Sequence, residues 1–198
     1  MNVKSIARVL AMLTLSVLPL AGRTAGSMTP AEQRIAKEVL HELLMLPYFG
    51  VFDYISFNVQ GHNVTLMGYV TRPSLESDAG DVVRGIEGVD KVDNQIEVLP
   101  PSTMDDGLRI RLFRAIYGYP ALEKYALGVQ KPIRIIVNME RVTLEGVVDS
   151  EADKNLVGIR AKSVPGTFPV TNNLRVQKPL RSVLHSNGLA HTDAALSN

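Results

Sequence analysis

The residue types that most often carry chemistry are sparse in this 198-residue chain, and their spacing does not form a recognisable site. There is no cysteine, which excludes disulfides, thiol nucleophiles and cysteine zinc sites. The four histidines are His41, His62, His185 and His191, and no two have the HxxxH spacing of a helical metal site. A GxSxG elbow, a Walker A loop and a GxGxxG fingerprint are also absent from the sequence. We therefore predict no catalytic residue, no metal site and no cofactor, and an enzyme is the least supported class.

The sequence Gly85-Ile86-Glu87-Gly88 has the GxxG pattern with which KH domains hold a nucleic-acid backbone. Here the loop itself carries an acid and no basic residue, and it is followed by Asp90 and Asp93. A helix C-terminus is the favoured interpretation, and a nucleic-acid clamp is the alternative. The net charge of +1, from 21 basic and 20 acidic residues, is also unlike that of a general nucleic-acid binder. We predict no nucleic-acid partner.

A predicted helix over residues 103–117 carries the strongest candidate for a binding surface. At 100° per residue, its apolar core stripe comprises Leu108, Leu112, Ala115 and Ile116. The opposite side carries Ile110, Arg111, Arg114 and Tyr117. Apolar anchors beside phosphate-pairing cations are what a helix at a membrane surface requires, so we predict a phospholipid-binding site at these four residues. The alternative is that Ile110 and Tyr117 pack against a neighbouring module while the arginines are solvated.

An internal repeat indicates the elements that position this helix. The sequence VTLMGYV at 64–70 returns as VTLEGVV at 142–148, and residues 55–98 align without a gap on residues 133–176. Upstream of these segments the offset falls from 78 to 73 residues, which places an insertion in a loop within 121–131. We interpret the chain as two copies of one module.

Each copy has the pattern of an α-β-β-α-β module. In the first copy, Thr29-Pro30-Ala31-Glu32 predicts a helix start, Gly61-His62-Asn63 predicts a hairpin turn, and Pro73 predicts the start of a second helix. We predict an α+β fold with two tandem modules at 29–99 and 102–178, each a three-stranded mixed sheet covered by two helices. Pro100-Pro101 separates the modules, and residues 179–198 are expected to be a disordered tail.

Glycines and asparagines that recur between the copies have structural explanations. Gly68 and Gly146 are expected to allow a helix or a neighbouring backbone to approach the strand closely. Asn94 and Asn172 are expected to hydrogen-bond to backbone near the start of a strand. A functional role for these residues is the alternative.

The N-terminus has the pattern of an export signal. Lys4 and Arg8 precede or border an apolar run at 9–21, and small residues follow up to Gly26. The run is too short for a comfortable membrane span, so we predict a signal peptide at 1–26, cleavage, and a soluble periplasmic protein. The alternatives are an uncleaved anchor and a cytoplasmic N-terminal helix.

The order of elements and the repeated motifs resemble the BON domain, a small module of exported bacterial proteins that usually occurs in tandem. The second copy matches better, with VTLEGVV at 142–148, Val164-Pro165-Gly166, and VTNNLRV at 170–176. The resemblance covers about residues 30–178 and implies binding to phospholipid membranes, envelope integrity and osmotic stress tolerance, without catalysis. A frequent form of the family is a lipoprotein, whereas this chain lacks the cysteine that acylation requires.

The two copies have net charges of opposite sign. Residues 29–101 contain 5 basic and 11 acidic residues, whereas residues 102–178 contain 12 basic and 8 acidic residues, so the net charges are −6 and +4. We predict an exported, non-enzymatic protein whose second copy binds anionic phospholipid as a peripheral partner. The alternative is a protein-interaction adaptor whose acidic copy binds another envelope protein.

Overall fold

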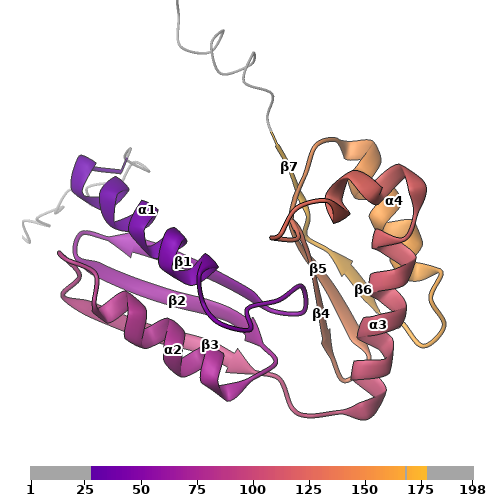
Figure 1. The fold of residues 1–198 in the computed structure, drawn as a ribbon, viewed down its shortest axis with the longest axis horizontal. Helices are drawn as coiled ribbons and strands as arrows, with labels where there is room; N and C mark the ends of the chain where they lie inside the picture. The colour runs from indigo at the N-terminus through magenta and orange to yellow at the C-terminus, as the bar shows by residue number, and fades with distance from the viewer. Residues whose placement is uncertain (1–27, 168, 178–198) are drawn as a thin grey trace, which may run out of the picture.

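The computed structural model describes residues 28–167 and 169–177, and these residues form two modules of the same element order (Figure 1). The first module comprises α1 (Pro30–Leu44), β1 (Tyr54–Gln60), β2 (Asn63–Val70), α2 (Pro73–Arg84) and β3 (Lys91–Val98). The second comprises α3 (Thr103–Tyr117), the 3-10 helix η1 (Pro120–Ala126), β4 (Ile133–Asn138), β5 (Arg141–Val148), α4 (Glu151–Lys162), β6 (Val170–Asn172) and β7 (Arg175–Val176). The predicted α+β class with tandem α-β-β-α-β modules is confirmed. The predicted signal peptide at 1–26 and tail at 179–198 lie outside the described residues.

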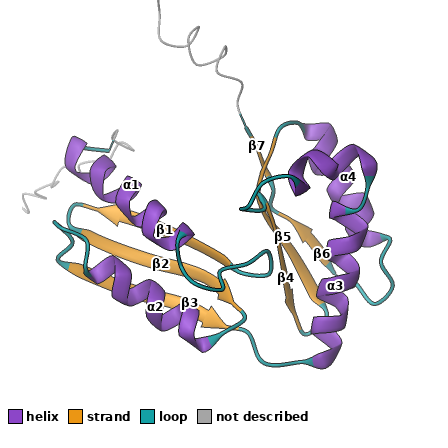
Figure 2. Ribbon diagram, in the orientation of Figure 1, coloured by secondary structure: helices purple, strands orange, loops and turns teal. Residues whose placement is uncertain are grey.

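Both modules have the same sheet topology. In the first module β1 pairs antiparallel with β2, and β2 pairs parallel with β3 through the α2 crossover. In the second, β4, β5 and β6 repeat this arrangement. The two long helices of each module lie against one face of its sheet (Figure 2), because alternate residues of the strands are apolar on that face.

The start of α1 is built as the sequence predicts. Thr29 accepts a hydrogen bond from the backbone of Glu32, and the Glu32 carboxylate accepts one from the backbone of Thr29 in return. The same carboxylate also accepts the N–H of Gly61 in the β1–β2 turn at 2.7 Å, and this bond lowers the pKa of Glu32. In the second module Ser150 caps α4 by accepting the N–H of Asp153.

Gly68 and Gly146 permit a close approach to the strand, as the sequence predicts, and the approaching group is neighbouring backbone. A Cβ atom on Gly68 would lie 2.0 Å from the carbonyl oxygen of Tyr54, and one on Gly146 would lie 1.9 Å from that of Pro132. Both glycines also have positive φ, at 139° and 116°. A side chain at either glycine would collide with the backbone at the point where the chain enters the first strand of the module.

The matching asparagines connect each crossover helix to its third strand. Asn94 donates to the Glu76 carbonyl in α2 at 2.8 Å, and Asn172 donates to the Lys154 carbonyl in α4 at 2.8 Å. The predicted side-chain to backbone hydrogen bond is therefore confirmed, and its acceptor lies in the helix. A Cβ atom on Gly158 would lie 2.9 Å from the Asn172 amide, so this helix glycine makes room for the contact.

The second module departs from the first in two places. The insertion at 121–131 was predicted as a loop, but its first half forms η1, because Leu122 and Tyr125 are buried in the core of this module. The third strand, predicted as continuous, is divided into β6 and β7. Both pieces pair with β5 in one register, with Leu144 opposite Asn172 and Val147 opposite Arg175.

The connection between α1 and β1 joins the two modules. The N–H of Ile135 in β4 donates to the Val51 carbonyl at 2.9 Å, so this loop occupies part of the free edge of β4. Arg134 is buried, donates to the Gly50 carbonyl at 2.6 Å, and places its guanidinium 4.5 Å from the ring centre of Phe49. The modules are therefore in direct contact.

Replacing Gly68 with alanine is expected to destabilise the protein strongly, because the new methyl group would collide with the Tyr54 carbonyl. The expected loss is roughly 3 kcal/mol or more, from steric displacement of backbone together with the unfavourable φ. Gly61→Ala is the matched control, since Gly61 also has positive φ (62°) but has no atom within 4 Å of the new Cβ. It should cost only about 1–2 kcal/mol. Urea unfolding of both variants measures the difference, and equal losses would contradict the close-contact explanation.

Candidate functional site

The helix α3 is oriented in most respects as its periodicity predicts. Ser102 caps its N-terminus by accepting the N–H of Asp105. The side chains of Leu108, Leu112 and Ile116 are buried in the core of the second module, as expected for the apolar stripe. The predicted surface residues Ile110, Arg111, Arg114 and Tyr117 do not all lie on one exposed face.

The predicted exposure of Tyr117 is wrong. Only 5% of this residue is accessible to solvent, and its hydroxyl donates to the Ile133 carbonyl at 2.6 Å. The N–H of Ile133 donates back to the same hydroxyl at 3.1 Å. Burial raises the pKa of Tyr117, so the phenol stays protonated and keeps its donor. The periodicity of α3 could not reveal this, because the start of β4 covers a side chain that faces away from the core stripe.

The other three predicted residues stay at the surface. Arg111 and Arg114 are exposed, and 44% of Ile110 is accessible. Ile110 also borders a hollow of about 350 Å³ between the modules, where Phe52 and Arg72 of the first module lie opposite it. The Ile110 side chain therefore borders this hollow and also contributes to the exposed surface of α3.

A second helix extends the exposed face. The helix α4 lies beside α3, and Arg160 donates to the Ala115 carbonyl of α3 at 3.2 Å. The same guanidinium lies 4.7 Å from the ring centre of Tyr119. On either side of Arg160 in α4, Ile159 is 63% accessible and Lys162 is exposed. The sequence interpretation missed these residues because it considered the periodicity of one helix at a time.

We define the basic helical face as the surface residues that these two helices contribute together: Ile110, Arg111, Arg114, Ile159, Arg160 and Lys162. The first module shows that its charge is not a requirement of the fold. Under the repeat alignment, Arg111 stands where the first module has Glu38, and Ile159 stands where it has Asp81. Comparing equivalent positions of the two copies is the sequence signal that could have found Ile159.

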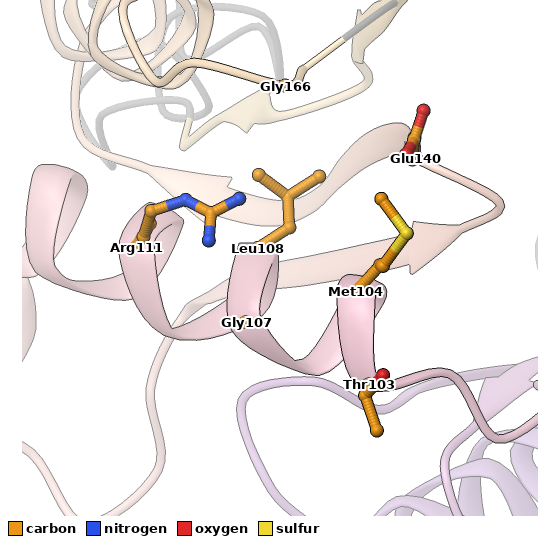
Figure 3. A pocket seen from close by; sticks show the side chains of 7 residues that line it. All are labelled: Thr103, Met104, Gly107, Leu108, Arg111, Glu140 and Gly166. Atoms are coloured by element: carbon orange, nitrogen blue, oxygen red, sulfur yellow. The ribbon is translucent and has the colours of Figure 1, made fainter.

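A hollow of about 200 Å³ adjoins this face at the N-terminal half of α3. Its lining consists of Thr103, Met104, Gly107, Leu108, Arg111, Glu140 and Gly166. Figure 3 shows Arg111 on one side of the hollow and Glu140 on the other, with Leu108 between them. The side chain of Met104, 67% exposed, also points into this region (Figure 3).

The turn that carries Glu140 is held by a buried carboxylate. Met139 and Glu140 both have positive φ, at 49° and 63°, which is unfavourable for residues with a side chain. Asp105, buried at the start of α3, accepts the N–H of Met139 at 3.0 Å and that of Glu140 at 2.9 Å. Its counterpart in the first module is Glu32, which binds the equivalent turn.

The described residues contain no group of three or more His, Cys, Asp or Glu side chains placed to hold a metal ion. His62 lies beside the Gly88 carbonyl, with 2.7 Å between Nδ1 and the oxygen, while His185 and His191 lie outside the described residues. The GxxG segment ends α2, with Gly85 as the C-cap and Gly88 at φ 88°. Within 28–167 and 169–177, no helix combines the length and apolar character needed to cross a membrane.

A family model described as the BON domain matches residues 31–100 and 121–178, which together exceed half of the chain. No curated protein matches the chain. Among solved structures, one from studies of CdsD, a structural protein of the type III secretion system of Chlamydia trachomatis, aligns with 12% identity and a TM-score of 0.32. The alignment covers 78% of this chain and 97% of that one. A structure of the CdsD C-terminal domain aligns with 12% identity over 72% of this chain and 96% of its own, with a TM-score of 0.27.

Removing the Tyr117 hydroxyl is expected to affect stability and leave the surface unchanged. Tyr117→Phe leaves the Ile133 N–H and carbonyl without their partner, which should cost about 1–3 kcal/mol of unfolding free energy. Tyr119→Phe is the matched control, because the Tyr119 side chain is half-exposed and its ring contact with Arg160 survives the change. Denaturant unfolding compares the two variants. If folded Tyr117→Phe lost vesicle binding without losing stability, the structural role of Tyr117 would be contradicted and a role in surface binding would be favoured.

Proposed function

This chain belongs to the BON-domain family, and on that premise we propose that it is a non-enzymatic exported protein that binds anionic phospholipid surfaces through the basic helical face. The site is peripheral, and the binding supports envelope integrity or osmotic stress tolerance. The signal peptide at 1–26 would deliver the chain to the periplasm.

One observation carries this proposal, which is the reversal of surface chemistry between two copies of the same fold. Arg111 replaces Glu38 and Ile159 replaces Asp81 at equivalent, solvent-facing helical positions. Both copies form the same sheet and the same helical layer, so neither choice is needed for folding. The second module combines cations with exposed aliphatic side chains, which suits an anionic, partly apolar interface.

The energetics of such a surface are modest. Each exposed cation near an anionic membrane contributes about 1 kcal/mol, and salt screens charges separated by more than about 10 Å at 0.1 M. The guanidinium groups add bidentate pairing with lipid phosphates. Ile159, 63% exposed, supplies an apolar anchor near Lys162. Weak, reversible and salt-dependent attachment follows from this combination.

An adaptor that binds another envelope protein is the second candidate function. The observation that favours it is the outer face of the β1–β2–β3 sheet, where Met67 and Tyr69 are 38% and 37% exposed in the acidic module. Such a function would be indifferent to the charge of a vesicle.

The double variant Arg111→Gln/Arg114→Gln is expected to weaken binding to phosphatidylglycerol-containing vesicles at low salt. At about 1 kcal/mol for each charge, the loss should be about tenfold to thirtyfold, and high salt should remove most of the difference. Neither side chain contributes to the core, so circular dichroism should stay unchanged.

The matched control is Arg84→Gln, which removes an exposed cation from α2 of the first module. It should leave vesicle binding unchanged. Vesicle titration of the wild type, the double variant and the control decides the outcome. Equal affinity of the folded double variant and the wild type would reject the lipid surface and favour the adaptor.

A further inference from the structure

We propose that the hollow lined by Arg111 and Glu140 is a headgroup site for phosphatidylethanolamine, in which the guanidinium binds the phosphate and the carboxylate binds the ammonium. This inference rests on the proposed function, because it names a specific lipid for the membrane that the basic helical face approaches. The ligand chemistry is a zwitterion with a phosphate and a primary ammonium group.

The first module shows why the hollow exists. At the equivalent place, Arg34 extends from α1 and donates to the Glu87 carbonyl at 2.9 Å. His62 reaches the neighbouring Gly88 carbonyl, and a Cβ atom on Gly88 would lie 2.9 Å from Arg34. These two side chains therefore fill the space between the first helix, the hairpin turn and the loop after the second helix.

The second module lacks both filling side chains. Under the repeat alignment Arg34 becomes Gly107 and His62 becomes Glu140. Gly107 has no side chain, and the Arg111 guanidinium lies beside it, 3.3 Å from the position of a Cβ atom, although a glycine inside a helix costs about 1 kcal/mol relative to alanine. A Cβ atom on Gly166 would lie 3.7 Å from the Arg111 guanidinium, so this cation reaches the loop across the hollow. The space is a consequence of substitutions that the common fold does not require.

The two charged side chains are positioned separately. Among the described residues, Arg111 and Glu140 form no ion pair with each other or with a third group. Glu140 belongs to a turn whose positive φ angles are maintained by the buried carboxylate of Asp105. Backbone strain that the surroundings maintain is frequent at binding sites. A cation and an anion on opposite sides of a hollow (Figure 3) match a ligand that carries both charges.

The chemistry distinguishes ethanolamine from choline. A primary ammonium group carries N–H donors that can reach the Glu140 carboxylate, whereas a quaternary ammonium group has none. The phosphate pairs with the Arg111 guanidinium as phosphates pair with arginine elsewhere. Met104, exposed at the rim, offers an apolar contact for the carbon atoms that follow the phosphate.

The test compares two vesicle sets that contain the same fraction of phosphatidylglycerol. The remaining lipid is phosphatidylcholine in one set and a mixture of phosphatidylcholine and phosphatidylethanolamine in the other. The wild-type protein should bind the ethanolamine set about fivefold more tightly, as expected for one exposed charge-assisted contact. Free O-phosphoethanolamine should reduce this preference, while phosphocholine and inorganic phosphate at equal concentration should not, which separates headgroup recognition from a general effect of the bilayer.

Two variants locate the effect. Gly107→Arg restores the side chain that fills this place in the first module, and its new Cβ atom meets only the flexible end of Arg111 at 3.3 Å. It should lose the ethanolamine preference while binding the phosphatidylcholine set at least as tightly, because it adds a positive charge. Glu140→Gln should also lose the preference and keep the anionic binding.

The outcomes separate this inference from the proposed function. Equal binding of the wild type to both sets, or a preference that both folded variants retain, would overturn the headgroup site and leave the anionic surface intact. Failure of the wild type to bind either set would overturn the lipid surface itself. Circular dichroism of each variant confirms that the comparison is made between folded proteins.

Discussion

The close approach of a carbonyl oxygen to a glycine in the second strand is the contact on which each module depends. The Tyr54 carbonyl lies 2.0 Å from the Cβ position of Gly68, and the Pro132 carbonyl lies 1.9 Å from that of Gly146. These contacts let the first strand enter the sheet at the end of β2 or β5. The strand pair then presents one apolar face, which the two helices cover. The asparagine of the third strand completes the arrangement by a hydrogen bond to the crossover helix.

Because the chain contains the fold twice, comparison of the two copies distinguishes the residues that the fold requires from those that can change. The glycines and asparagines that both copies keep are explained by backbone contacts and capping. The residues that differ include exposed positions of the helical layer and the hairpin turn: Arg34 becomes Gly107, Glu38 becomes Arg111 and His62 becomes Glu140. Such positions can change chemistry without cost to the core. At these positions the second module differs from the first: it is basic, and a hollow lies beside its first helix.

The contact between the modules depends on a buried cation. Arg134 is buried between them, and its burial lowers the pKa of its guanidinium. Its contacts with the Gly50 carbonyl and the Phe49 ring compensate for the lost hydration. Phe52 adds an edge-to-face contact with Phe113, at 6.4 Å between ring centres. The same loop occupies part of the free edge of β4, where an exposed strand could otherwise pair with another chain.

The repeat, the order of the elements, the capping box of α1 and the core stripe of α3 could be predicted from the sequence, because short-range periodicity and local hydrogen bonding set these features. The sequence also predicted that Gly68 and Gly146 admit either a helix or a neighbouring backbone, and the structure shows that the approaching group is backbone. The burial of Tyr117, the basic face that α3 and α4 share, and the hollow that Arg111 and Glu140 border depend on the tertiary structure. Each of these outcomes brings together segments that are distant in sequence. The angular position of a side chain on its own helix carries no information about which other element covers it.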